Sequence, residues 1–153
     1  MGEDSAGVKF PPPFIFLLAI LTGLGIHRVW PMAVLPAALA MPVGVCFIVA
    51  AMTLAMLGFR ELGRHKTTVR PDEPSSAIVK TGPYRFTRNP LYVALSLLQL
   101  GIGVWTNNLW IVLMLVLVWI LMTTQVIARE EAYLERAFGE EYLSYKASVR
   151  RWI

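Results

Sequence analysis

The sequence has a single cysteine and no long tract of charge of one sign. Cys46 has no second thiol with which to form an internal disulfide, and it stands in an apolar block where a lone cysteine is usually a small buried hydrophobe. No cluster of cysteines and histidines offers a metal or haem site. The net charge of +4 comes without a basic tract, so nucleic acid is not an expected partner.

The first residues also lack the features of a targeting signal. The stretch MGEDSAGVKFPPP is acidic and rich in proline, without the basic region of a signal peptide. Ala6 stands where a myristoylation signal needs serine or threonine.

What the sequence has in excess is apolar residues. They make up 56% of 153 residues and come in blocks, which is typical of a membrane protein. Four blocks predict membrane-spanning helices, and the first of them is short enough to need tilt or flanking residues. The predicted spans are residues 13–29, 33–59, 90–105 and 109–128. Only residues 106–108 separate the last two spans, which predicts a tight antiparallel hairpin.

Positive charge lies mainly on one side of these spans. The loop 60–89 carries seven lysines and arginines and the segment 129–151 carries five, whereas the opposite side has only Arg28. By the positive-inside rule, the loop and both termini are expected in the cytoplasm, in a prokaryotic inner membrane. The aromatic anchors expected at the far interface are Trp30, Trp105 and Trp110.

The residues after the fourth span are too charged for a fifth. Apolar residues recur there at helical spacing, which predicts an amphipathic cytoplasmic helix over 129–150, bent or broken near Gly139. The members of this stripe are Leu134, Phe138, Tyr142, Tyr145 and Val149. The expected fold class is therefore all-α integral membrane, with one domain over residues 1–153.

Unusual polar residues gather where the third span begins and where the fourth ends. A tight hairpin places these two points side by side, so Arg88, Asn89 and Tyr92 are expected to face Glu130 or Glu131 across a cytoplasmic pocket. Taken singly, each charge is equally well read as a membrane-interface anchor with an exposed counter-ion. The sequences Gly-Pro and Asn-Pro in this region are likewise compatible with a simple turn and a helix start.

The order of these features resembles the isoprenylcysteine carboxyl methyltransferases and the related phospholipid methyltransferases. The matching stretches are IVKTGPYRFTRNPLY (78–92) and EEAYLERAFGEEYLSYKASVRRW (130–152). The family pattern is Leu-Val-x-x-Gly-x-Tyr, then Arg-His-Pro-x-Tyr, and after a hairpin Glu-Glu and Phe-Gly-x-x-Tyr-x-x-Tyr. The resemblance covers the C-terminal half, and the first two spans match only as generic membrane helices.

The resemblance implies S-adenosylmethionine as the methyl donor. A carboxylate accepts hydrogen bonds from a ribose diol or an amine, and tyrosine rings attract adenine or a sulfonium cation. No Gly-x-Gly-x-x-Gly follows a strand, so a Rossmann site is not expected. By position, the family's cofactor contacts fall on Ser76, Ala77, Ile78, Val79, Tyr84, Asn89, Pro90, Leu91, Tyr92 and Glu130.

The predicted catalytic residues are Arg88 and Glu131. A guanidinium forks onto a carboxylate or phosphate, so Arg88 is expected to orient an anionic acceptor. Two positions depart from the family. Asn89 stands where many members have histidine, and it cannot act as a base near neutral pH. Val126 stands about where the eukaryotic carboxyl methyltransferases carry a substrate-contacting arginine, so prenylcysteine is not carried over as the substrate.

The expected reaction is methyl transfer to a lipid-like or prenylated small acceptor that enters from the bilayer, with carboxyl O-methylation as the first choice. Catalysis would consist mainly of positioning and desolvation. A phospholipid N-methyltransferase is the first alternative, and its amine acceptor would not need Arg88. A sterol-type membrane reductase would use a nicotinamide cofactor, and the Glu-Glu and Phe-Gly-x-x-Tyr stretches argue against it. A non-catalytic membrane subunit predicts no cofactor binding. The sequence does not define an oligomeric state.

Overall fold

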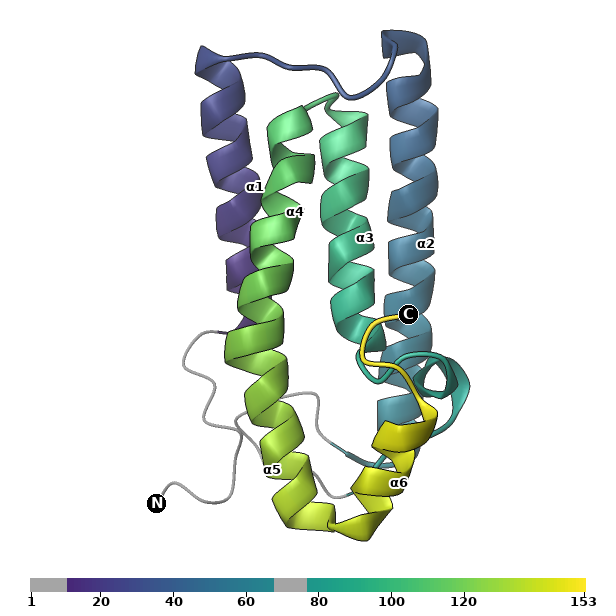
Figure 1. Cartoon of the computed structure of the whole chain (residues 1–153). Helices are drawn as coiled ribbons and strands as arrows, with labels where there is room; N and C mark the ends of the chain where they lie inside the picture. The colour runs from purple at the N-terminus through teal and green to yellow at the C-terminus, as the bar shows by residue number, and fades with distance from the viewer. Residues whose placement is uncertain (1–10, 68–76) are drawn as a thin grey trace.

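The chain folds into apolar helices that lie side by side, with a polar cap at one end (Figure 1). This computed structural model describes residues 11–67 and 77–153, and no β-strand occurs in these two ranges. The expected all-α class is therefore confirmed for them. The elements are α1 (Pro12–Val29), α2 (Ala37–Arg64), the 3-10 turn η1 (Gly82–Arg85), α3 (Pro90–Trp105), α4 (Leu109–Leu121), the π-helix η2 (Met122–Ile127), α5 (Ala128–Phe138) and α6 (Glu140–Ser148).

Proline marks the start of three apolar helices. α1 and α3 carry proline in their first turn, and α2 begins directly after Pro36. Proline is tolerated there because a first-turn N–H has no intrahelical acceptor to lose. Consequently α2 begins at Ala37, later than the predicted Ala33. It ends at Arg64, past the predicted residue 59, because the arginines and glutamate that follow are good helix formers.

The predicted hairpin between the third and fourth apolar helices is confirmed. Three residues separate α3 from α4, and Asn107 among them has a φ of 50°, a left-handed conformation that asparagine tolerates. Asn108 caps α4, because its side chain accepts hydrogen bonds from the backbone N–H of Trp110 at 3.0 Å and of Ile111 at 3.3 Å.

The helix that begins as α4 does not end at the predicted boundary. It continues through the π-helix η2 into α5, and it stops only at Gly139, which has a φ of 52°. The predicted tail helix is present as α5 and α6, and α5 continues the fourth helix because a change from apolar to charged residues does not interrupt a helix. The predicted break near Gly139 is confirmed, since glycine adopts this conformation without a Cβ clash.

The four apolar helices pack as two pairs joined in the middle. α2 packs against α3, α1 packs against α4, and α3 packs against α4 (Figure 1). Glycines allow two of these approaches. A Cβ on Gly44 of α2 would lie 2.5 Å from the backbone nitrogen of Trp105, and a Cβ on Gly23 of α1 would lie 2.7 Å from Ile111. By contrast, a Cβ on Gly25 would meet nothing within 4 Å among the described residues.

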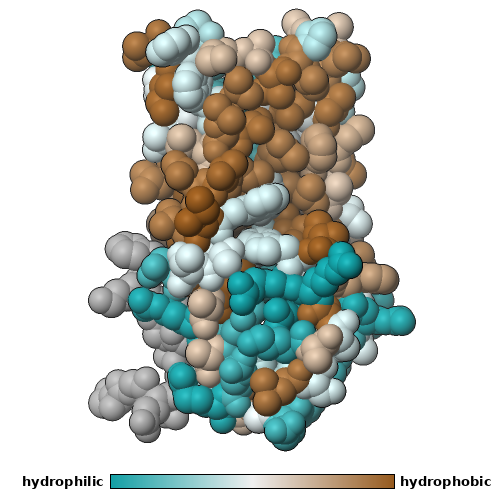
Figure 2. All heavy atoms as spheres, in the orientation of Figure 1, coloured by the Kyte–Doolittle hydropathy of each residue, from teal (hydrophilic) through white to brown (hydrophobic). Residues whose placement is uncertain are grey.

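The outer faces of the bundle are apolar and the cap is polar (Figure 2). Cys46 lies on the outer face of α2 and is exposed, so the expectation of a buried thiol was wrong. A membrane helix presents apolar residues to lipid as readily as to a core, and hydropathy does not separate the two. The buried core cluster consists of Phe16, Leu115, Val118, Met122, Val126 and Ile127.

The end of the bundle opposite the cap is tied together by the hairpin. The side-chain oxygen of Asn107 accepts from the backbone N–H of Val34 at 2.8 Å and of Leu35 at 3.0 Å. Trp110 donates its ring N–H to the backbone oxygen of Trp30, and their ring centroids lie 6.2 Å apart. The link between α1 and α2 is thereby bound to the turn between α3 and α4.

Within residues 11–67 and 77–153, three helices are long and apolar enough to cross a membrane. They are α1, α2 and the continuous helix Leu109–Phe138, and they make this a multi-pass membrane protein. α3 is also apolar but has only 16 residues.

Candidate active site

The polar cap contains a cavity at the point where α2 ends, α3 begins and the fourth helix leaves the bundle (Figures 1 and 2). Its walls come from α2, from the segment before η1, from the turn before α3, and from α5 and α6. Segments far apart in sequence therefore meet around it. The lining residues are Leu62, Thr67, Ala77, Ile78, Val79, Tyr84, Arg88, Asn89, Glu130, Glu131, Leu134, Tyr142 and Tyr145.

One wall is held against α2 by Glu61. The hydroxyl of Thr81 donates to Glu61 Oε2 at 2.6 Å, and Arg64 donates to Oε1 at 2.8 Å. The next residue, Gly82, has a φ of 58°, and a Cβ there would lie 2.6 Å from the Glu61 side chain. Only glycine fits this turn without strain, and the turn directs Tyr84 into the cavity.

Glu130 lies in the polar cap, two residues beyond the end of the apolar part of its helix. The hydroxyl of Tyr92 donates to Glu130 Oε1 at 2.5 Å across the gap between α3 and α5. Burial raises the pKa of Glu130 to about 7, the hydrogen bond from Tyr92 lowers it, and the charge of Glu131 raises it further. Burial likewise raises the pKa of Tyr84.

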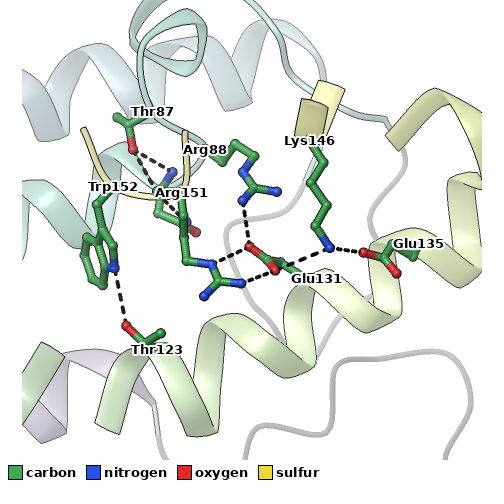
Figure 3. Close-up of polar contacts among 9 residues, drawn as sticks. Thr87, Arg88, Thr123, Glu131, Glu135, Lys146, Arg151 and Trp152 are labelled. Atoms are coloured by element: carbon green, nitrogen blue, oxygen red, sulfur yellow. Dashed lines mark hydrogen bonds and ion pairs between the residues drawn. The ribbon is translucent and has the colours of Figure 1, made fainter. Parts of the chain in front are cut away.

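Glu131 is surrounded by cations (Figure 3). Arg88 Nη2 lies 3.1 Å from Glu131 Oε1, and the side chains of both residues are only 8% exposed. Arg151 forks onto the same carboxylate, with Nε donating to Oε1 at 2.9 Å and Nη2 donating to Oε2 at 2.7 Å. Lys146 lies 3.8 Å from Oε2 and also pairs with Glu135. The predicted contact between Arg88 and the acidic pair is thus present.

This arrangement leaves some hydrogen-bond donors of the Arg88 side chain without a partner among the described residues. Its Nε and Nη1 are buried and have no hydrogen-bond partner within residues 11–67 and 77–153. A buried donor without a partner is costly, and a guanidinium suits an anionic ligand. The cavity thus offers an anion-binding donor set at Arg88 and an acceptor at Glu130. The acceptor at Glu130 suits S-adenosylmethionine, which carries an ammonium and a ribose diol.

Most of the predicted cofactor residues lie around the cavity. Ser76 lies outside the described residues, Pro90 is buried at the start of α3, and Leu91 packs against the cluster of Leu62, Val79 and Tyr84. Tyr92 reaches the cavity only through its bond to Glu130. Successive residues of a helix point in different directions, so a continuous run does not face one ligand. The predicted residues that line the cavity are Ala77, Ile78, Val79, Tyr84, Arg88, Asn89, Glu130 and Glu131.

Sequence reasoning placed Tyr142 and Tyr145 on the apolar stripe of an amphipathic helix, and in the structure both are buried against the cavity. α6 folds back over the cap after Gly139, and Tyr145 donates its hydroxyl to the backbone oxygen of Tyr84 at 2.7 Å. The Phe-Gly-x-x-Tyr-x-x-Tyr stretch was the available signal for these two residues. Arg151 was not predicted at all, because no periodic pattern links it to Glu131.

The chain belongs to the phospholipid methyltransferase family, whose sequence profile matches residues 39–141. This confirms the resemblance drawn from the two motifs, and it makes the chain a membrane methyltransferase domain of that family. The family implies S-adenosylmethionine as the cofactor, and the carboxylate of Glu130 on the cavity wall suits the amine or diol of that molecule. No group of three histidine, cysteine, aspartate or glutamate side chains in the described part of the chain is placed to hold a metal ion.

Three bacterial proteins are similar to this chain. An uncharacterised protein of Haemophilus influenzae is 44% identical over 66 residues, which is 41% of this chain and all of that protein. The cobalt-zinc-cadmium resistance protein CzcN of Cupriavidus metallidurans is 39% identical over 66 residues, or 43% of this chain and 31% of CzcN. The nickel-cobalt-cadmium resistance protein NccN of Alcaligenes xylosoxydans xylosoxydans is 31% identical over 129 residues. That match covers 82% of this chain and 54% of NccN.

Proposed function

We propose that this protein is an S-adenosylmethionine-dependent membrane methyltransferase that methylates a carboxylate oxygen of a lipid-like acceptor. The observation that carries the proposal is Arg88, a buried guanidinium with two nitrogens that have no partner in the described ranges, on the wall of a cavity shared with Glu130. An anionic acceptor would satisfy those donors. Exposed apolar helix faces begin directly beside the cap, so an acceptor anchored in lipid has a short path to it (Figure 2).

The proposed topology has four crossings, with α3 as the short one. Its 16 residues span about 24 Å, less than the roughly 30 Å of a bilayer core. The cap therefore lies close to the lipid, as a membrane acceptor requires. By the positive-inside rule, the cap and both termini face the cytoplasm, where the cofactor is made.

The cofactor would be held mainly by Glu130 and by the segment before η1. The Glu130 carboxylate accepts from an amine or a diol, and the backbone of Ala77, Ile78 and Val79 borders the same space. Tyr142 and Tyr145 of α6 exclude water from the other side. When bound, S-adenosylmethionine supplies a methyl group that is already activated on a sulfonium.

The work of the chain is then to position and desolvate the acceptor. The carboxylate oxygen of the acceptor forms a bond to the methyl carbon while the carbon–sulfur bond breaks, and the electron pair of that bond stays on sulfur. An anion and a cation become two neutral groups, and no proton moves. A site with Asn89 in place of a histidine is compatible with this reaction, because no base is required.

A second candidate is methylation of an amine-headed phospholipid. A protonated amine has no lone pair and must lose a proton before it accepts a methyl group, and Glu130 has a pKa raised to about 7, close to that of a general base at neutral pH. The two candidates differ in their products. Methyl label in a carboxyl ester is released as methanol by mild base, whereas label on nitrogen is retained.

The first test is calorimetric titration of S-adenosylmethionine into detergent-purified protein. Wild type should bind saturably, and Glu130→Ala should lose at least tenfold in affinity, on the scale of one charge-assisted hydrogen bond. Glu140→Ala removes an exposed carboxylate of α6 and serves as the matched control, with affinity unchanged. Well-folded wild type that binds no S-adenosylmethionine would overturn the proposed function.

A further inference from the structure

The segment 149–153 lies across the turn that carries Arg88 (Figure 3). The backbone N–H of Arg88 donates to the backbone oxygen of Arg150 at 2.9 Å. The backbone oxygen of Arg151 accepts from the Thr87 hydroxyl at 3.2 Å and from the Asn89 side-chain amide at 2.8 Å. Asn89, expected to contact the cofactor, therefore also holds this segment. Three bonds from consecutive residues fix the segment beside the cavity.

Arg151 competes with Arg88 for the same carboxylate. Arg151 holds both oxygens of Glu131 in a forked pair, whereas Arg88 touches Glu131 through Nη2 alone. A carboxylate that is forked by one guanidinium cannot be forked by another in the same plane. A fork of Arg88 onto Glu131 would use Nη2 and one further nitrogen, so the pairing with Arg151 keeps one of the two nitrogens without partners in the described ranges, Nε and Nη1, from being engaged.

Trp152, which follows Arg151, brings an apolar surface to the same side of the cap. Trp152 donates its ring N–H to the hydroxyl of Thr123 in η2 at 3.3 Å, and its ring lies 5.8 Å from the ring of Trp119. Trp119 in turn donates to the hydroxyl of Ser96 on α3 at 2.9 Å, so the indoles lie where α3 and the fourth helix face each other. Trp119 is 48% exposed on the apolar face of the bundle. A hydrocarbon chain lying on that face would meet these indoles before it reached the cap.

We propose that segment 149–153 completes the acceptor site for an anionic amphiphile. Arg151 is a positioning residue, because it occupies both oxygens of Glu131 and limits the contact of Glu131 with Arg88 to Nη2, which keeps a further Arg88 donor free for the anion. Trp152 lines the path of the apolar chain. The inference rests on the proposed function for the identity of the reaction. The anion is either the carboxylate that is methylated or the phosphate of a phospholipid head group.

The test measures binding of three labelled probes to protein in phosphatidylcholine nanodiscs, with empty nanodiscs as the background. The probes are dodecanoate, dodecyl phosphate and uncharged dodecanol. At least one anion should bind more tightly than dodecanol, by about tenfold for a forked charge-assisted pair, and Arg88→Gln should remove that difference. The tighter of the two anions identifies the head group.

The role of Arg151 is tested by a rescue. Arg151→Gln should weaken binding of the anionic probe severalfold, because Glu131 is then free to fork onto Arg88. Glu131→Gln in the same chain removes the competitor and should restore binding to at least the wild-type level. Arg151→Lys, which keeps the charge without the fork, should be intermediate. If Arg151 were merely structural, the double variant would be no better than the single one, and that result would overturn the inference.

Trp152→Ala should weaken the binding of dodecanoate more than the binding of hexanoate, because only the longer chain reaches the indole. The matched control is Trp105→Ala, which removes an exposed tryptophan at the opposite end of α3. It should leave the affinity for both probes unchanged. Equal effects of Trp152→Ala on the two chain lengths would remove Trp152 from the acceptor path.

Cofactor titration on the same preparations separates the two proposals. Protein that binds S-adenosylmethionine but prefers neither anion over dodecanol contradicts the acceptor site alone. Protein that shows the anion preference and its rescue but binds no cofactor contradicts the proposed function alone.

Discussion

Glu130 and Glu131 are neighbours in sequence with different surroundings. Glu130 accepts a hydrogen bond from Tyr92 and has a pKa raised to about 7, mainly by burial. Glu131 lies among the cationic groups of Arg88, Lys146 and Arg151. Consecutive helix residues point about 100° apart, so one carboxylate faces the cavity and α3 while the other faces the cationic cluster. The two roles follow from the environment and not from the residue type.

The raised pKa of Glu130 predicts that cofactor affinity depends on pH. The ionised carboxylate accepts from the cofactor's amine or diol more strongly than the protonated form does, so affinity should fall by up to about tenfold per pH unit below pH 7 and level off above it. Calorimetric titration of S-adenosylmethionine between pH 5.5 and 8.5, roughly the range around that pKa, measures this. Glu130→Gln should flatten the curve. The ligand's own groups still titrate when Glu130→Gln protein is measured. If wild type and Glu130→Gln therefore show the same pH dependence of affinity, Glu130 is excluded as the cause of that dependence.

At the scale of elements, the cap is built by helix ends and the bundle by close helix approach. The fourth helix projects beyond the apolar region as α5, and Gly139 returns the chain as α6 over the cavity (Figure 1). α2 approaches α3 through Gly44, which lies against the end of α3. Both features depend on a glycine where a larger residue would clash or strain the backbone.

Gly44→Ala should destabilise the bundle. The new Cβ would lie 2.5 Å from the backbone nitrogen of Trp105, so α2 and α3 must move apart, at a cost on the order of 2 kcal/mol. The midpoint of thermal unfolding in detergent should fall by several degrees. Gly25→Ala in α1 is the matched control, because its Cβ would meet nothing within 4 Å in the described part of the chain. Equal midpoints for the two variants would contradict the close contact.

At the scale of the whole molecule, polar and apolar surfaces divide the protein into two zones (Figure 2). The cavity lies in the polar zone, and the hairpin of α3 and α4 closes the opposite end. In the proposed function, the cofactor would reach this cavity from water and the acceptor would reach it from lipid.

The proposed orientation predicts which end can be labelled from outside the cell. In a chain with Cys46→Ser, Thr106→Cys marks the hairpin end and Ala137→Cys marks the cap, and both positions are exposed. A membrane-impermeant maleimide on intact cells should label Thr106→Cys but label Ala137→Cys only after permeabilisation, because the positively charged cap stays in the cytoplasm. The reverse pattern would invert the topology. Labelling of both positions from outside would remove α3 as a crossing.

Much of this protein could be predicted from local pattern. Hydropathy located the apolar helices, because each helix must cover itself with apolar side chains in lipid. The short link 106–108 then required the start of α3 to lie beside the exit of the fourth helix, and so Arg88 and Tyr92 came to be expected opposite Glu130 and Glu131.

Other features were decided only by the tertiary structure. The fold-back of α6, the burial of Tyr142 and Tyr145, and the attachment of Arg151 to Glu131 all depend on contacts between segments with no shared period. The exposure of Cys46 could not be predicted from the sequence for a different reason, because a lipid-facing position and a core position are equally apolar. Sequence alone thus determines what crosses the apolar zone and what borders its polar end, since solvation acts on each residue separately. Which of those polar residues pair, and which keep free donors for a ligand, depends on their geometry in three dimensions.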